Sequence, residues 1–254
     1  MIIKDKVVWI PGGATGLGLA SAKAFYEQGA LVAISSRNEE RGQEVADSFG
    51  DRGLYVKADS TISSELEAVV ATITAEWGRI DVLVNAAGIS GIAPLLTAEG
   101  PGSFDAFKNV IDINLNASFD AARLAAWEMT KNNPDENGER GVIILFSSVA
   151  ANKVATGQSQ AYSASKAGLL GLVKEASFEL APHGIRIVGI QPGIFTTPLI
   201  DKPGYEKIRE LFVSRQTFPK REGDPKLIGD LCVHITENWF MNRTCIECDA
   251  GYTG

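Results

Sequence analysis

The sequence predicts an α/β fold in which helices cover both faces of a doubly wound, seven-stranded parallel sheet. Short apolar runs alternate with longer stretches of helical character along the chain. The apolar runs are nearly continuous, which is typical of strands buried on both faces. The 254 residues are enough for one large domain, and no stretch has the composition of a linker. With right-handed crossovers, this alternation gives a single domain with a doubly wound sheet.

The elements follow from these runs in chain order. The expected strands are rich in Val, Ile and Leu and lie at Val7–Ile10, Leu31–Ser35, Leu54–Ala58, Val82–Asn85, Val142–Ser147, Arg186–Ile190 and Thr244–Cys248. The expected helices lie between them, near 15–28, 39–49, 63–77, 104–130, 162–180 and 226–237. The polar, turn-rich stretch 131–141 is expected to be a surface loop.

The segment 193–225 interrupts the alternation, and we expect it to form a substrate lid, because long connections after a strand often cover a site. It holds six basic and five acidic residues, a net +1 in a chain of net charge −7. A solvated amphipathic helix is the favoured interpretation, and a weak preference for an anionic substrate tail is the other. Its apolar residues suggest a hydrophobic substrate body; they are Phe195, Leu199, Ile200, Leu211, Phe212 and Phe218.

Composition excludes several classes of protein. Asp and Glu (31) outnumber Lys and Arg (24), which disfavours a nucleic-acid binder. No apolar run reaches the roughly 18 residues of a membrane span, and the first residues do not resemble a signal peptide. Three cysteines cannot all pair, so we expect reduced thiols and a cytoplasmic location. Cys245 and Cys248 form a C-x-x-C, but no second pair or suitably spaced His completes a metal site.

A glycine-rich turn follows the first strand. Glycines permit a tight turn, close approach of a phosphate and close packing of helix on strand, while the helix amino end offers free N–H groups to a pyrophosphate. The alternative is a glycine turn without a ligand. The predicted cofactor contacts here are Gly12, Thr15, Gly16, Leu17 and Gly18.

The end of the second strand predicts the choice of cofactor. An acidic residue there accepts hydrogen bonds from ribose hydroxyls and repels a 2′-phosphate. This chain has Ser36 followed by Arg37, whose guanidinium suits phosphate oxygens. We therefore expect NADP to be preferred over NAD, with NAD(H) still possible; the alternative is that Arg37 is merely exposed.

Tyr162 and Lys166 stand at i and i+4, so they share one face of a helix. A nearby ammonium favours the phenolate and is expected to lower the Tyr162 pKa, which would suit proton exchange with an alcohol during hydride transfer. Ser148, after a strand, is placed to hydrogen-bond the same substrate oxygen. Asn114 lies in an apolar stretch and is expected to hold a backbone group or a water. Each residue alone has a structural explanation, but the combination after a nucleotide turn favours catalysis.

These residues resemble the short-chain dehydrogenase/reductase family over nearly the whole chain. The resemblance implies a Rossmann fold, NAD(P)(H), pro-S hydride transfer and a homotetramer or homodimer. Its catalytic tetrad matches Asn114, Ser148, Tyr162 and Lys166. Further cofactor contacts that it implies are Asp59, Ser60, Asn85, Ala86, Gly88, Pro192, Gly193 and Thr196, beside Tyr162 and Lys166. Pro11 replaces the usual leading Thr of the glycine motif.

The expected function is therefore an NAD(P)-dependent oxidoreductase that interconverts a secondary alcohol and a ketone. Loop stretches at 133–144, 180–186 and 218–225 resemble the 3-hydroxyacyl-CoA and hydroxysteroid dehydrogenase branch of the family. An NAD-linked dehydrogenase of that branch is the first alternative. A nucleotide-binding regulator without turnover is the second.

Overall fold

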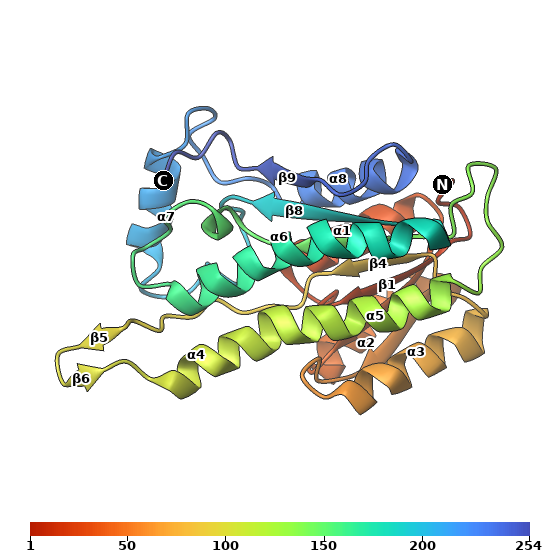
Figure 1. Cartoon of the computed structure of the whole chain (residues 1–254), viewed down its shortest axis with the longest axis horizontal. Helices are drawn as coiled ribbons and strands as arrows, with labels where there is room; N and C mark the ends of the chain where they lie inside the picture. Colours follow the sequence, from red (N-terminus) through yellow and green to blue (C-terminus); the bar gives the residue numbers. More distant parts are fainter.

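The structure, a computed structural model that describes residues 1–254, contains a seven-stranded parallel sheet (Figure 1). The strands are β1 (Val7–Pro11), β2 (Leu31–Ser36), β3 (Gly53–Lys57), β4 (Val82–Asn85), β7 (Gly141–Phe146), β8 (Ile185–Pro192) and β9 (Cys245–Cys248). Their spatial order is β3-β2-β1-β4-β7-β8-β9. The direction of winding reverses between β1 and β4, so the crevice outside their carboxyl ends is the expected ligand position.

Helices cover both faces of this sheet. They are α1 (Gly16–Glu27), α2 (Glu39–Asp47), α3 (Ser63–Trp77), α4 (Phe104–Ile111), α5 (Ala117–Met129), α6 (Gln160–Leu180), α7 (Glu206–Ser214) and α8 (Lys226–Glu237). Strand residues alternate between two buried clusters: Val8 and Ile10 pack with α1 and α8, whereas Val7 and Trp9 pack with α3, α5 and α6. This two-sided burial explains the continuous apolar runs and confirms the predicted fold class.

Most predicted boundaries lie within two residues of the observed ones, but the expected helix 104–130 is divided. A π-helical turn at Asp112–Asn116 separates α4 from α5. Such turns are rare and often occur at functional sites. The short hairpin of β5 (Leu96–Thr97) and β6 (Gly100–Pro101) was also not predicted, because two-residue strands leave no periodic pattern.

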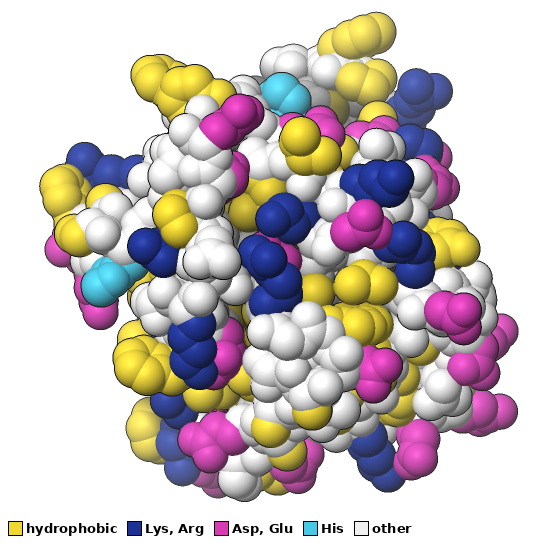
Figure 2. Space-filling view, turned by 90° about the vertical axis from the view of Figure 1, so that its right-hand side faces the viewer, with side chains coloured by type: hydrophobic (Ala, Val, Ile, Leu, Met, Phe, Trp, Pro, Cys, Tyr) yellow, Lys and Arg dark blue, Asp and Glu magenta, His cyan; other side chains and the backbone are white.

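The carboxyl ends of the strands and the opposite end of the sheet carry different elements. The arrows of β8 and β9 in Figure 1 point to the end that carries α7 and the β5–β6 hairpin. Figure 2 shows the opposite end, where basic and acidic side chains are interspersed and apolar ones are scattered. No helix in the chain combines the length and apolarity that crossing a bilayer would require.

Candidate active site

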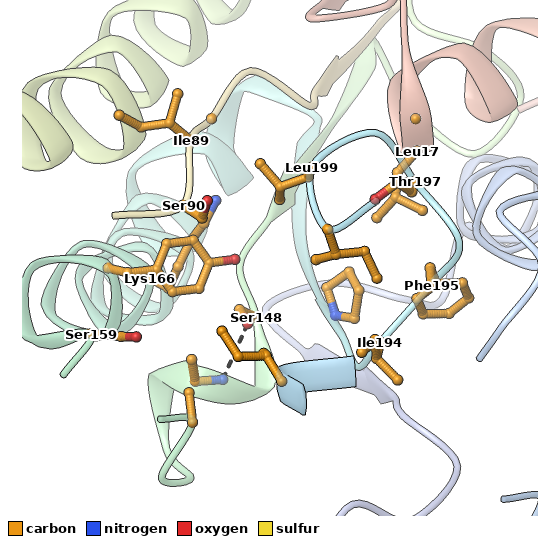
Figure 3. Close-up of a pocket in the computed structure, with 18 of the residues that line it drawn as sticks. Leu17, Ile89, Ser90, Ser148, Ser159, Lys166, Ile194, Phe195, Thr197 and Leu199 are labelled. Atoms are coloured by element: carbon orange, nitrogen blue, oxygen red, sulfur yellow. Dashed lines mark hydrogen bonds between the residues drawn. The ribbon is translucent and has the colours of Figure 1, made fainter. Parts of the chain in front are cut away.

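A cavity of about 790 Å³ opens at the carboxyl ends of the central strands. It is lined by the glycine turn after β1, by the segments that follow β4, β7 and β8, by α6 and by the lid. Figure 3 shows labelled side chains from these separate elements converging on it, among them Ser148, Lys166, Ser90 and Leu199. Twelve of the predicted site residues line the cavity: Gly12, Thr15, Gly16, Leu17, Gly18, Ala86, Gly88, Ser148, Tyr162, Lys166, Pro192 and Gly193.

The glycine turn packs too closely against neighbouring backbone to accept side chains at two of its glycines. Gly12 has φ +78°, and a Cβ there would lie 2.8 Å from the backbone nitrogen of Ala87. A Cβ at Gly18 would collide with the Gly12 carbonyl oxygen. Thr15 is the N-cap of α1 but its side chain makes no capping hydrogen bond, so first-turn N–H groups of this helix are free toward the cavity. The residues therefore fit a dinucleotide pyrophosphate.

Lys166 and Tyr162 lie on the first turns of α6, whose position is fixed by two hydrogen bonds to the end of β7. The Lys166 Nζ donates to the Phe146 carbonyl at 2.7 Å, and the Ser147 hydroxyl donates to the Lys166 carbonyl at 2.7 Å. The Lys166 Nζ lies 5.8 Å from the centre of the Tyr162 ring. The i, i+4 spacing thus brings amine and phenol to one wall of the cavity, as the sequence predicts.

Burial dominates the electrostatics of this pair. It lowers the pKa of the Lys166 amine to about 8 and raises the pKa of the Tyr162 phenol, against a hydrogen bond with Ser148 that acts in the opposite direction. The expected lowering of the Tyr162 pKa by Lys166 is therefore not what this structure shows. The physical reason is that desolvation disfavours both charged forms, and the Lys166 amine donates to a backbone carbonyl rather than to the phenol.

Asn114 is fully buried in the π-helical turn and does not line the cavity. Its Oδ1 accepts from the Ile89 N–H at 2.8 Å, and its Nδ2 donates to the Ile89 carbonyl at 3.0 Å and to the Ser165 hydroxyl at 3.1 Å. Ile89 itself lines the cavity. Asn114 therefore positions the cavity wall after β4 and joins it to α6.

Ser148 follows β7 and lines the cavity beside Tyr162. Its Oγ accepts from the Ala150 N–H at 3.1 Å, the hydrogen bond drawn in Figure 3. This bond starts the short turn Val149–Ala151 and holds the Ser148 oxygen in place, while the hydroxyl proton is available to the Tyr162 phenol.

Seven predicted site residues fall outside this lining: Ser36, Arg37, Asp59, Ser60, Asn85, Asn114 and Thr196. Arg37 and Asp59 lie at the ends of neighbouring strands, with Arg37 Nη1 4.0 Å from Asp59 Oδ2. Two hydrogen bonds from Thr61 lower the pKa of the Asp59 carboxyl. Asn85 is buried and donates to the Ser118 hydroxyl at 2.7 Å, so its side chain supports α5 instead of a ligand.

The prediction for Thr196 requires a correction. Its hydroxyl donates to Glu222 at 3.0 Å, and the neighbouring Thr197 lines the cavity instead. The Thr196 N–H donates to the Gly223 carbonyl at 3.1 Å, and the chain turns at Thr197, so the two threonines face different surroundings. A Cβ at Gly16 would lie 3.4 Å from the Thr197 Cβ, which places Thr197 against the glycine turn.

Sequence reasoning also missed Arg41. Its Nε donates to the Ala14 carbonyl at 3.0 Å, so the guanidinium reaches from the first turn of α2 to the glycine turn. The Asn38 cap, whose side chain accepts from the Arg41 N–H, fixes where this helix begins. A basic residue three positions after an N-cap was the only available signal, and it is a weak one.

The lid is held differently from the catalytic wall. Arg209 on α7 pairs with Asp201 at 3.0 Å and with Glu222, which in turn accepts from Thr196. The Tyr205 hydroxyl lies 3.4 Å from the Ser90 hydroxyl and so bridges the lid to the segment after β4. Phe212 lines the cavity and stacks on Tyr252 with ring centres 4.9 Å apart.

The two cysteines of the C-x-x-C in β9 have their side chains on opposite faces of the sheet. Cys245 packs in the cluster with α3, α5 and α6, whereas Cys248 packs in the cluster with α1 and α8. Burial raises the pKa of both thiols, which disfavours the thiolate that binds metals. These side chains contribute packing on opposite faces.

Comparisons with known proteins agree with this geometry. A family model described as "short chain dehydrogenase" matches residues 6–206. The 3-hydroxyacyl-CoA dehydrogenase type-2 of Bos taurus is 39% identical over 249 residues, 97% of this chain and 95% of that protein. Ipsdienol dehydrogenase of Ips pini is 30% identical over 97% of this chain and 96% of its own. The solved structure of 3-hydroxyacyl-CoA dehydrogenase type-2 from Mycobacterium avium has a TM-score of 0.92 at 31% identity, covering 100% of this chain and 97% of that chain.

Proposed function

The chain belongs to the short-chain dehydrogenase/reductase family, and we propose that Tyr162 is the acid–base group with which it interconverts a secondary alcohol and a ketone. The family resemblance predicted from sequence is thereby confirmed. The protein is an oxidoreductase of CH–OH groups that uses NAD(P)(H). The observation that carries the proposal is the convergence of Ser148, Tyr162 and Lys166 on one cavity with the glycine turn.

Each residue has a separate task in the reduction direction. The bound nicotinamide dinucleotide supplies the hydride. The Ser148 hydroxyl donates to the carbonyl oxygen of the substrate, and the Tyr162 hydroxyl gives it a proton as the alcohol forms. Lys166 binds the cofactor ribose, and its ammonium opposes the effect of burial on the Tyr162 pKa when it is protonated. Asn114 acts through Ile89 by keeping the cavity segment after β4 in place.

Replacing Tyr162 with Phe tests this assignment. Loss of a general acid is expected to lower kcat by about 10²–10⁴-fold while leaving the dissociation constant for NAD(P)H within about twofold. Steady-state rates with a panel of ketones and alcohols, combined with cofactor fluorescence titration, measure both quantities. Tyr26→Phe is the matched control, because the Tyr26 ring stacks on Phe49 away from the cavity.

This variant also separates an enzyme from a nucleotide-binding regulator. A regulator would keep its cofactor affinity and its function without the phenol. An unchanged reaction rate in Tyr162→Phe would refute the acid–base role.

We further propose that NADP(H) is preferred over NAD(H). Ser36 ends β2 without a carboxylate, and its hydroxyl donates to the Asn38 carbonyl at 3.3 Å. The Arg37 side chain is 69% exposed, and its 4.0 Å ion pair with Asp59 is too exposed to hold it strongly. Arg41 places a second guanidinium beside the glycine turn. Two arginines near the end of β2, with no carboxylate at position 36 itself, suit a 2′-phosphate.

Arg37→Ala tests the preference. Charge-assisted hydrogen bonds to a phosphate are worth about 1.5–3 kcal/mol, so the affinity for NADPH is expected to fall about tenfold or more. The affinity for NADH should change less than twofold. Lys57→Ala is the matched control, since Lys57 pairs with Glu39 on the same exposed edge. Equal losses for the two cofactors would exclude a role for Arg37 in phosphate recognition.

A second candidate, an NAD-linked 3-hydroxyacyl-CoA dehydrogenase, is favoured by the relatives from Bos taurus and Mycobacterium avium that carry this name. Acetoacetyl-CoA assayed with NADH and NADPH distinguishes the two candidates. Faster oxidation of NADH than of NADPH with this thioester would favour the second.

The assembly is a separate proposal. We propose a homotetramer or homodimer, because α5 and α6 carry large exposed apolar side chains, among them Phe119, Trp127 and Phe178. Sedimentation equilibrium measures the oligomeric state directly, and a monomer at assay concentration would contradict the proposal. The cytoplasmic location predicted from composition stays a prediction.

A further inference from the structure

The lining of the cavity has a charge opposite to that of the protein. No Asp or Glu side chain lines it, whereas three lysines do: Lys166, Lys202 and Lys207. In the whole chain, acidic residues outnumber basic ones by 31 to 24. A concave surface with only positive side chains raises the local concentration of anions. Lys166 is explained by the catalytic wall, but Lys202 and Lys207 are not.

Lys202 and Lys207 are the two basic residues of the lid that both line the cavity and have no partner. Arg209 is held by Asp201 and Glu222, and Arg215 and Lys220 donate to backbone carbonyls. Lys202 and Lys207 are exposed and make no ion pair or side-chain hydrogen bond in the structure. Arg221 is also unpaired, but it does not line the cavity. Two lysines on the lining of the cavity therefore have ammonium groups without a partner in the chain.

Much of the remaining lining of the cavity is apolar. Ile89, Leu199, Ile208, Leu211 and Phe212 line the cavity, and Ser90 and Tyr205 add hydroxyls. The cavity thus presents an acid–base group on α6, an apolar lining and two basic side chains on the lid. Such a set of surfaces fits an amphiphilic molecule with a charged group away from its reacting carbon.

We propose that the substrate carries an anionic group, a carboxylate or a phosphate, that Lys202 and Lys207 bind while its alcohol or ketone carbon lies at Tyr162. The inference rests on the proposed function, whose site it extends to the lid. Lysine ammonium groups act as point charges and accept either anion without a required geometry. Of the two interpretations that the lid sequence left open, the anionic tail is the one that the unpaired lysines at the cavity favour.

Matched ketones test the proposal. The probes are 5-oxohexanoate, 7-oxooctanoate and 9-oxodecanoate, each compared with its neutral methyl ester, and 9-oxodecyl phosphate for the phosphate arm. With two exposed cations on the lining, the wild-type kcat/KM is expected to be about tenfold higher for the anion than for its ester. This ratio should fall as ionic strength rises. The acid and phosphate arms show which anion is preferred.

In the double variant Lys202→Gln/Lys207→Gln, the ratio of kcat/KM for the anion to kcat/KM for its ester is expected to fall to near one, because KM rises for the anion alone. Lys174→Gln/Arg221→Gln is the matched control, because it removes two exposed charges that do not line the cavity. A wild-type ratio near one, or an equal loss for acid and ester in the double variant, would overturn the proposal. So would the same change of ratio in the control.

A binding measurement keeps this test independent of turnover. Calorimetry of decanoate and of decanol with the protein saturated with NADP should give tighter binding of decanoate, lost in Lys202→Gln/Lys207→Gln. If no ketone is reduced but decanoate binds in this way, the proposed reaction fails and the anion site stands. If ketones are reduced and decanoate binds no better than decanol, the anion site fails alone.

Discussion

The catalytic wall and the lid face each other across one cavity, but different interactions hold them. The wall, made of Asn114, Ser148, Tyr162 and Lys166, is fixed by buried hydrogen bonds of 2.7–3.1 Å to backbone groups and hydroxyls. The lid, residues 193–225, is fixed by partly exposed ion pairs around Arg209, by the contact between Ser90 and Tyr205, by the stacking of Phe212 on Tyr252 and by hydrogen bonds from Arg215 to the Val154 and Ala155 carbonyls. Segments held by few buried contacts unfold locally at a lower free-energy cost than segments held by many. The comparison predicts that changes in the wall act mainly on kcat and that changes in the lid act mainly on substrate binding.

Asn114→Ala is expected to damage the geometry of the wall strongly. It removes the three side-chain hydrogen bonds that join Ile89 and Ser165, and a displacement of about 1 Å in a catalytic geometry can cost about 100-fold in kcat. Steady-state kinetics should show this fall in kcat with a smaller change in cofactor affinity. Asn116→Ala, which removes an exposed hydrogen bond to Asp112 on the same turn, should leave kcat unchanged. Equal effects of the two variants would refute a positioning role for Asn114.

Lys166→Met tests what it costs to bury the amine. Burial lowers its pKa from 10.5 to about 8, so the unfolded chain binds the proton more tightly. The free energy of unfolding therefore rises as the pH increases from about 8 to 10.5, and this stability is lost as the pH falls through 8. The corresponding penalty at pH 7 is about 3 kcal/mol. The Met substitution removes this penalty, but it also removes the hydrogen bond to the Phe146 carbonyl, which lowers the stability by about 1 kcal/mol.

Lys166→Met should thus be inactive but more stable at pH 7 by about 2 kcal/mol, with a difference that shrinks above pH 8. Urea unfolding from pH 7 to 10.5 measures this. Lys174→Met, an exposed substitution on the same helix, should change stability by less than about 0.5 kcal/mol. If Lys166→Met is less stable than the wild type at pH 7, the buried amine stabilises the folded protein and the expected penalty is refuted.

Gly88→Ala is expected to have a moderate effect. The added Cβ would lie 3.2 Å from Asn114 Oδ1, which must move by a few tenths of an ångström, and 3.4 Å from Lys166 Nζ, which is an ordinary contact. We expect kcat to fall about tenfold. Gly171→Ala on α6 meets no atom within 4 Å and should leave kcat unchanged and raise stability by about 0.5–1 kcal/mol. A kcat for Gly88→Ala equal to that of the wild type would show that the wall tolerates displacement.

Arg209→Met should have the smallest effect and act on the lid alone. Its ion pairs with Asp201 and Glu222 are partly exposed, so their loss is expected to raise the substrate KM about threefold with kcat nearly unchanged. The same variant should be cleaved faster by a protease within the lid. Arg221→Met, exposed and unpaired, is the control. A large loss of kcat in Arg209→Met would contradict the separation of wall and lid.

The same contrast explains how much was predictable from the sequence. The parallel sheet and the pair of Tyr162 and Lys166 follow from local patterns, a two-sided apolar run and an i, i+4 spacing. Thr197 lines the cavity where Thr196 was predicted, because the direction of each side chain depends on how an irregular segment folds. The contact of Arg41 with Ala14 depends on where a long side chain lies across another element. Spacing along the chain contains no information on those directions. The raised pKa of Tyr162 was missed because burial is a property of the folded chain.

The π-helical turn at Asp112–Asn116 has a consequence for how this site can change. Each residue of a helix rotates the chain by about 100°, so one extra residue changes the phase of every side chain beyond it. The inward direction of the Asn114 amide therefore depends on chain length in this turn as well as on residue type. A deletion of one residue there would restore a regular helix and rotate the amide away from Ile89, an outcome that no single substitution at an exposed position of the turn would reproduce.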